Sequence, residues 1–167
     1  GFPQYSVSIA LAQRGVVTQA VVYDPVRNDL FTASKGGGAF LNDKRIRVTK
    51  LDRIANALLG TGYKAGSSAA LEEFLKMYQI MGERSQGVRR AGSAALDLAY
   101  VACGRLDGFY EKGLKPWDIA AGALMITESG GIVGEFNGES DYLYKGDIIA
   151  ASPKVFGQMV ALLTPFA

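Results

Sequence analysis

Three positions in the second half of the chain combine residue types and spacing that suit chemistry on a polar ligand. Ser93 opens one predicted helix, Glu111 ends a predicted strand, and Asp118 lies in the first turn of the next helix. Backbone N–H groups at a helix start lack partners and the macrodipole is positive there, so residues 92–94 can bind an anion or a polyhydroxylated ligand. We therefore expect these three positions to converge on one pocket.

A purely structural interpretation of the same residues remains open. Ser and Asp are common at helix N-termini because their side chains accept backbone hydrogen bonds, so Ser93 and Asp118 could act only as caps. Glu111 could be a solvated strand end. The spacing of the three residues fits both interpretations, and only their arrangement in space separates them.

The composition excludes several classes of catalytic site. The chain contains no His, so a Ser-His-Asp or Cys-His nucleophile system cannot form within it. A His-bearing zinc site is excluded for the same reason, and a single Cys cannot build a Cys-only site. Hydrolytic chemistry here would depend on carboxylates, Lys or Tyr, and carboxylates favour hard cations such as Mg²⁺.

Length and charge indicate a soluble globular protein. The 167 residues are 49% hydrophobic and 20% charged, with a net charge of +2 that is too small to argue for nucleic-acid binding. We find no apolar run of about 18 residues and expect neither a membrane span nor a signal peptide. The single Cys103 cannot form an intrachain disulfide, which fits a reducing, cytoplasmic compartment.

Two helices and a strand are predicted to hold the three candidate positions. One helix covers residues 93–103 and the other residues 117–129, and glycines follow both. Residues 106–111 form the buried strand between them. Other predicted strands (57–62, 87–90, 131–136 and 146–151) alternate with helices near 67–81 and 153–163, which predicts an α/β layer over residues 51–167. The helix near 67–81 should bury its apolar face of Leu71, Phe74, Leu75 and Tyr78.

Residues 1–50 predict an antiparallel meander that belongs to a first sheet. Its strands cover residues 5–11, 16–23 and 30–33, and the first strand alternates Tyr5, Val7, Ile9 and Leu11 with small residues, which predicts one covered face. The three glycines at 36–38 precede a strand-like segment, so they fit a hairpin better than a phosphate loop.

Three further carboxylates have no spacing that makes them ligands. Asp24 follows a strand, Asp97 lies one turn into a helix, and Asp107 precedes a glycine. We expect Asp97 to pack or to bond a neighbouring loop, and Asp107 to be a turn residue.

Three motifs resemble the inositol monophosphatase family, most closely its bacterial, extragenic-suppressor branch. They are RRAGSAALD at residues 89–97, DGFYE at 107–111 and PWDIAAG at 116–122, with further matches at 23–25, 36–42 and 128–131. The likeness covers essentially the whole chain in order. It implies an αβαβα sandwich, an α/β fold of which this chain would hold the C-terminal two thirds, usually assembled as a homodimer.

The resemblance also implies an activity, namely magnesium-dependent, lithium-sensitive hydrolysis of inositol monophosphate by a metal-activated water. Asp118 matches the catalytic Trp-Asp carboxylate that ligates a second metal and contacts substrate. Glu111 matches a carboxylate that binds inositol hydroxyls. The helix start that contacts substrate matches Gly92, Ser93 and Ala94.

One departure from the family pattern is large. The upstream Glu-Glu region and the Asp-Pro-Ile/Leu-Asp-Gly-Thr motif, which supply most metal ligands and the phosphate-binding group, have no match in this chain. We therefore expect the 167 residues alone to be inactive. Related phosphatases of fructose bisphosphate, adenosine phosphosulfate, histidinol phosphate or NADP remain alternatives. A non-catalytic module that binds protein or RNA is another, and the sequence leaves contact with the transcription machinery open.

Overall fold

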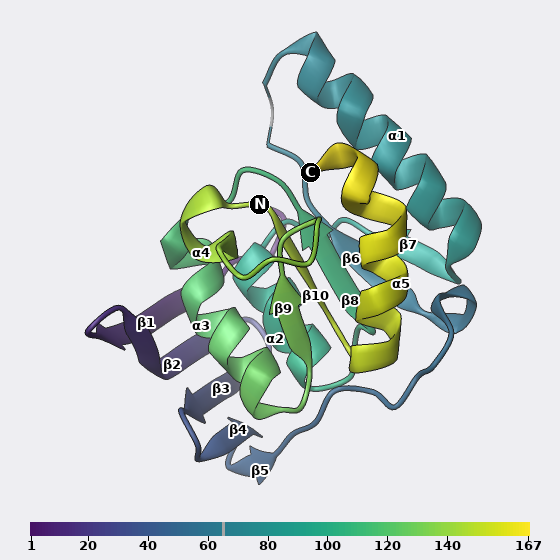
Figure 1. Cartoon of the computed structure of the whole chain (residues 1–167). Coiled ribbons are helices and arrows are strands. Elements are labelled where there is room, and N and C mark those ends of the chain that lie inside the picture. Colours follow the sequence, from purple (N-terminus) through teal and green to yellow (C-terminus); the bar gives the residue numbers. More distant parts are fainter. Residues whose placement is uncertain (65) are drawn as a thin grey trace.

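The computed structural model describes residues 1–64 and 66–167 and contains two five-stranded sheets (Figure 1). The first sheet is an antiparallel meander in the order β1-β2-β3-β4-β5. Its strands are β1 (Val7–Gln13), β2 (Val16–Asp24), β3 (Asp29–Ser34), β4 (Gly38–Leu41) and β5 (Lys44–Arg45). Each strand pairs with the next through a short turn, so the predicted meander is confirmed.

The second sheet is mixed and has the order β7-β6-β8-β10-β9. Its strands are β6 (Leu58–Thr61), β7 (Gly87–Arg89), β8 (Gly108–Glu111), β9 (Ile132–Gly134) and β10 (Ile148–Ala151). Strand β6 runs parallel to both β7 and β8, whereas β10 is antiparallel to β8 and β9. The carboxyl ends of β6, β7 and β8 therefore lie at one edge of the sheet.

The helices complete a sheet–helix–sheet–helix arrangement (Figure 1). They are α1 (Ser68–Arg84), α2 (Ala94–Ala102), α3 (Pro116–Glu128), α4 (Tyr142–Lys145) and α5 (Pro153–Leu163), with 3₁₀ turns η1 (Ile54–Asn56) and η2 (Thr164–Phe166). Helices α2 and α3 lie between the sheets, and α1 and α5 cover the far face of the second sheet. Among the described residues, no helix is long and apolar enough to cross a membrane.

Strand β10 shows why strands of the second sheet consist of consecutive apolar residues. Ile148 and Ala150 pack into the core formed with α2, α3 and the first sheet, while Ile149 and Ala151 pack into the core formed with α1 and α5. All four residues are fully buried. Because both faces of this sheet are covered, neither face needs polar side chains.

The first strand turns toward the helices the opposite face from the one that its pattern suggested, and none of its residues is buried. Val7, Ile9 and Leu11 are about half exposed, on the uncovered side of the first sheet. The serines instead face the helices: Ser6 bonds Ser93, and Ser8 donates to the backbone carbonyl of Trp117. The period of two was correct, but the covered side is set by where α2 and α3 pack.

The predicted apolar face of α1 was also wrong. Leu71, Leu75 and Tyr78 are exposed, and the helix buries Met77 and Met81 instead. Phe74 is the one predicted residue that packs against the core. Helix α1 therefore contacts the second sheet through a narrower stripe, rotated from the one with the most apolar residues.

Glycines 36–38 form the turn between β3 and β4, as the hairpin interpretation predicted. The carboxylate of Glu128, at the end of α3, accepts hydrogen bonds from the backbone N–H groups of Gly36 and Gly38, at 2.7 and 2.8 Å. Two N–H groups that could have faced an anion are thus satisfied within the protein. This contact fastens the hairpin to the helix layer.

Candidate active site

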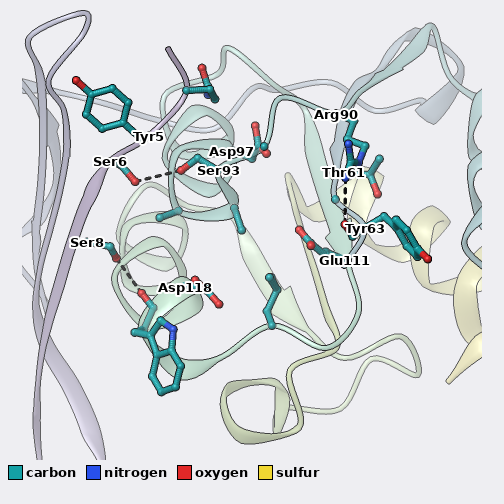
Figure 2. A pocket seen from close by; sticks show the side chains of 17 residues that line it. Tyr5, Ser6, Ser8, Thr61, Tyr63, Arg90, Ser93, Asp97, Glu111 and Asp118 are labelled. Carbon is teal, nitrogen blue, oxygen red and sulfur yellow. Dashed lines mark hydrogen bonds between the residues drawn. The ribbon is translucent and has the colours of Figure 1, made fainter. Parts of the chain in front are cut away.

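A cavity of about 560 Å³ opens where the carboxyl ends of β6 and β8 meet the starts of α2 and α3 (Figure 2). In open α/β sheets, ligands bind at the carboxyl ends of parallel strands. All five residues that the sequence singled out line this cavity: Gly92, Ser93, Ala94, Glu111 and Asp118. The structure therefore brings together three segments that are separate in sequence.

The start of α2 is a helix cap that also faces the cavity. The Ser93 hydroxyl accepts the backbone N–H of Leu96 and lies 3.1 Å from the hydroxyl of Ser6. Gly92 has φ +112°, a left-handed conformation that favours glycine, and it turns the chain into the helix. Ser93 therefore caps α2 and also lines the cavity, because the cap uses only part of its hydrogen-bonding capacity.

Asp118 combines the same two features. Its Oδ2 accepts the backbone N–H of Lys115, the N-cap of α3, at 2.9 Å. Its other carboxylate oxygen makes no hydrogen bond within the described part of the chain. The side chain is half-buried at the rim of the cavity, so one oxygen anchors the helix start while the other is available to a ligand.

Glu111 is not the solvated strand end that the structural interpretation allowed. It ends β8 with a residue exposure of 9%, and its carboxyl group lies against Gly62, where an added Cβ would overlap it. Burial, together with the charge of Asp118, raises the pKa of Glu111 to about 7, although Arg90 opposes the shift. Glu111 therefore exchanges a proton near neutral pH.

Asp97 is a cavity carboxylate that the sequence analysis did not place in the site. We expected packing or a hydrogen bond to a loop, but its side chain makes no hydrogen bond within the described residues and lines the cavity. Its exposure is only 3%. Burial and the charge of Glu111 raise the pKa of Asp97 to about 8. Asp97 follows Ser93 by four residues, and this helical spacing on one face of α2 was the signal for it.

The helix position of Asp97 does not explain the burial of its carboxyl group. A macrodipole stabilises a carboxylate in the first turn by about 0.3–1 kcal/mol. Burying an unpaired charge costs several kcal/mol even after relaxation. The net effect destabilises the charged form, in agreement with the direction of the pKa shift.

Two other carboxylates have structural roles. Asp24 is fully buried and accepts hydrogen bonds from the backbone of Val26, from Arg27 and from the hydroxyl of Tyr100. Asp107 accepts the backbone N–H of Leu58 at 2.7 Å and so joins the start of β6 to the segment before β8. The expected turn role of Asp107 is therefore incomplete, since its side chain also ties two strands together.

The cavity fits part of a magnesium site. Asp118 offers a carboxylate oxygen, the hard ligand that Mg²⁺ prefers. Within residues 1–64 and 66–167, however, no group of three or more His, Cys, Asp or Glu side chains is arranged to hold a metal ion. Mg²⁺ needs near-octahedral oxygen coordination, so these residues supply only a fraction of its ligands.

Comparison with known proteins identifies the class. The chain belongs to the inositol monophosphatase family, whose family model matches residues 1–165. A putative Nus factor SuhB of Neisseria meningitidis serogroup B is 48% identical over 98% of this chain. The extragenic suppressor protein suhB of Bartonella henselae has a similar structure, with a TM-score of 0.92 over 96% of this chain at 40% identity. The inositol monophosphatase of Anabaena sp. PCC 7120 gives 0.89 over 98% at 34% identity.

This chain spans less than two thirds of those two SuhB proteins. It covers 63% of the Neisseria relative, 62% of the Bartonella structure and 67% of the Anabaena structure. The family and the fold that the motifs predicted are confirmed.

Proposed function

We propose that the whole protein is a magnesium-dependent phosphate monoesterase acting on inositol monophosphate, and that this chain supplies the substrate side of its site. One observation carries the proposal: in a member of this family, Glu111, Asp118 and the start of α2 meet at a single cavity. The cavity joins hydrogen-bond acceptors for hydroxyl groups to a helix start suited to an anion.

Each cavity residue of this chain would have a separate role, in binding either the metal or the substrate. Asp118 would hold one magnesium ion through its free oxygen, and the bound ion would stabilise negative charge on the leaving oxygen. Glu111 accepts hydrogen bonds from ring hydroxyls, and residues 92–94 orient the ester from the helix start. Lys115 fixes Asp118 through its backbone N–H, so the carboxylate is pre-oriented.

The test is phosphate release from inositol 1-phosphate by the full-length protein, with and without Mg²⁺ and Li⁺. Asp118→Asn should lower kcat/KM at least about a hundredfold and weaken the dependence on Mg²⁺, because one anionic ligand is lost. The matched control is Asp43→Asn, in the exposed turn between β4 and β5, where Asn tolerates the positive φ. Wild-type kinetics in Asp118→Asn would remove this residue from the site.

A comparison of kcat/KM across a panel of phosphate esters identifies the alcohol that the site accepts. Inositol 1-phosphate should give the highest kcat/KM, with fructose bisphosphate, histidinol phosphate, adenosine phosphosulfate and NADP as competitors. The 167 residues alone should release no phosphate, because their metal ligands are incomplete. Light scattering of the full-length protein tests the homodimer that is typical of the family.

A second candidate function rests on the names of relatives. A putative Nus factor SuhB of Neisseria meningitidis is 48% identical to this chain and a Nus factor SuhB of Pseudomonas aeruginosa is 46% identical, so we also propose a binding role in transcription. Such a role should not depend on the catalytic metal. Copurification with transcription proteins should therefore survive chelation of Mg²⁺ and the Asp118→Asn change, and loss of binding in either case would tie the contact to the active site.

A further inference from the structure

Asp97 presents a buried carboxyl group to the cavity without a partner in the described part of the chain. Its exposure is 3%, yet neither carboxyl oxygen takes part in a hydrogen bond there. The carboxyl oxygens are not fully enclosed and can meet a ligand in the cavity that Asp97 lines. A buried side chain whose polar atoms have no protein partner calls for a specific cause. A packing role would be served better by an apolar side chain of similar size.

The segment at the end of β6 leaves space for the carboxyl of Glu111 beside Asp97. Gly60 lies in β6 and Gly62 directly follows its last residue, Thr61, so the extended backbone turns both glycines toward the face that α2 covers. A Cβ on Gly60 would crowd the side chains of Leu106 and Phe109, at 2.9 and 3.1 Å, and would only touch the Asp97 Cβ, at 3.7 Å. One on Gly62 would overlap the carboxyl of Glu111. The bare backbone at Gly62 thus makes room for the carboxyl of Glu111, and the side chains of Asp97 and Glu111 line one cavity from α2 and β8 (Figure 2).

We propose that Asp97 determines substrate specificity by binding a second hydroxyl group of the alcohol, next to the hydroxyl bound by Glu111. This inference rests on the proposed phosphatase function. The ligand class is a phosphate ester of a polyhydroxylated alcohol, in which neighbouring hydroxyls act as donor and acceptor. A hydroxyl group can satisfy Asp97 in a way that no described residue does.

The pKa values of Asp97 and Glu111 agree with the binding of two neighbouring hydroxyl groups. Burial raises the pKa of Asp97 to about 8 and that of Glu111 to about 7, and the charges that face them are those of Asp118 and Arg90. Both carboxyl groups are therefore protonated more readily than usual, so each can donate a hydrogen bond as well as accept one. Two adjacent ring hydroxyls match such a pair, whereas an ester without neighbouring hydroxyls leaves Asp97 unpaired.

The experiment compares Asp97→Leu and Asp97→Asn in the full-length protein. For each variant, kcat/KM is measured for inositol 1-phosphate and for phenyl phosphate, which has no hydroxyl beside the ester. Asp97→Leu should lower the ratio of the two values at least tenfold, mainly through the KM for inositol 1-phosphate. Asp97→Asn keeps a donor and an acceptor in the same shape and should hold the ratio within threefold of the wild type.

Two results would overturn the inference. One is an unchanged ratio of the two kcat/KM values in Asp97→Leu, and the other is an equal fall of this ratio in Asp97→Leu and Asp97→Asn. Asp97→Leu should fold, since Leu is a strong helix former and removes a buried polar group, and a thermal melt checks the fold. If the wild type released phosphate from neither ester, the proposed function would fail. Saturation-transfer NMR with myo-inositol would then test Asp97 by itself, with signal in the wild type and in Asp97→Asn, and loss in Asp97→Leu, as the supporting result.

Discussion

At the scale of single residues, the cavity holds two acidic groups, Asp97 and Glu111, that are protonated more readily than usual. Asp97 and Glu111 lie on different elements but share one low-dielectric space, so each disfavours the charge of its neighbours. Groups of this kind cluster where a protein binds ligands or performs catalysis. The same burial that prepares the cavity for a polar ligand must also weaken the fold while the cavity holds none.

This cost predicts a pH dependence of stability. The pKa of Asp97 rises from its ordinary 3.8 to about 8 on folding, so the folded state binds more protons than the unfolded state between these values. Stability must therefore fall as pH rises from about 4 to about 8. Asp97→Asn removes this term, so its gain in unfolding free energy over the wild type should grow by at least about 1 kcal/mol between pH 5 and pH 9.

The measurement is denaturant unfolding of both proteins at several pH values in a metal-free buffer. Glu111 acts in the same direction over a narrower range, since its pKa rises from 4.5 to about 7, and it remains in both proteins. A difference between variant and wild type that did not change with pH would show that Asp97 is charged throughout.

At the scale of elements, the turns and the periods were predictable from sequence, whereas the covered faces were not. Arg14 and Gly15 have positive φ and turn the chain between the predicted strands 5–11 and 16–23, because turn chemistry is local. The buried faces of β1 and α1 depend on which helix packs against them, and no local pattern carries that information. Asp97 was missed for the same reason: its helix was predicted correctly, but the empty space beside it was not.

The contact between Glu128 and the β3–β4 hairpin gives an element-scale prediction. A carboxylate at a helix C-terminus is disfavoured by the macrodipole. Glu128 nevertheless ends α3, because it accepts two short hydrogen bonds from Gly36 and Gly38. Glu128→Ala should lower the unfolding free energy by about 1–3 kcal/mol, since two N–H groups lose a charged acceptor.

Glu128→Gln is the matched control, because its single carbonyl oxygen can keep one of the two bonds and it adds no charge at the helix end. Its loss of stability should be about half as large or less. Hydrogen exchange at Gly36 and Gly38 reports the site directly. Equal protection in wild type and Glu128→Ala would show that the hairpin does not depend on the helix.

At the scale of the whole molecule, the layer of α2 and α3 packs against both sheets. One core joins these helices to the first sheet and to one face of the second, and the cavity forms at their N-terminal ends. Gly122 permits this arrangement, because an added Cβ would overlap Leu98 on the facing helix. The spacing between the two helices therefore sets both the packing of the sheets and the width of the site.

Gly122→Ala should accordingly destabilise the protein, by about 1–3 kcal/mol, because the overpacked helices must separate. The matched control is Gly157→Ala in α5, where nothing lies within 4 Å of the added Cβ. There the same substitution should stabilise the fold by up to about 1 kcal/mol, since Ala is the better helix former. Opposite signs in denaturant unfolding would show that contact between α2 and α3, and not helix propensity, governs position 122. If Gly122→Ala also stabilised the protein, the two helices would have room to spare, and the cavity at their ends would not be held at a fixed width.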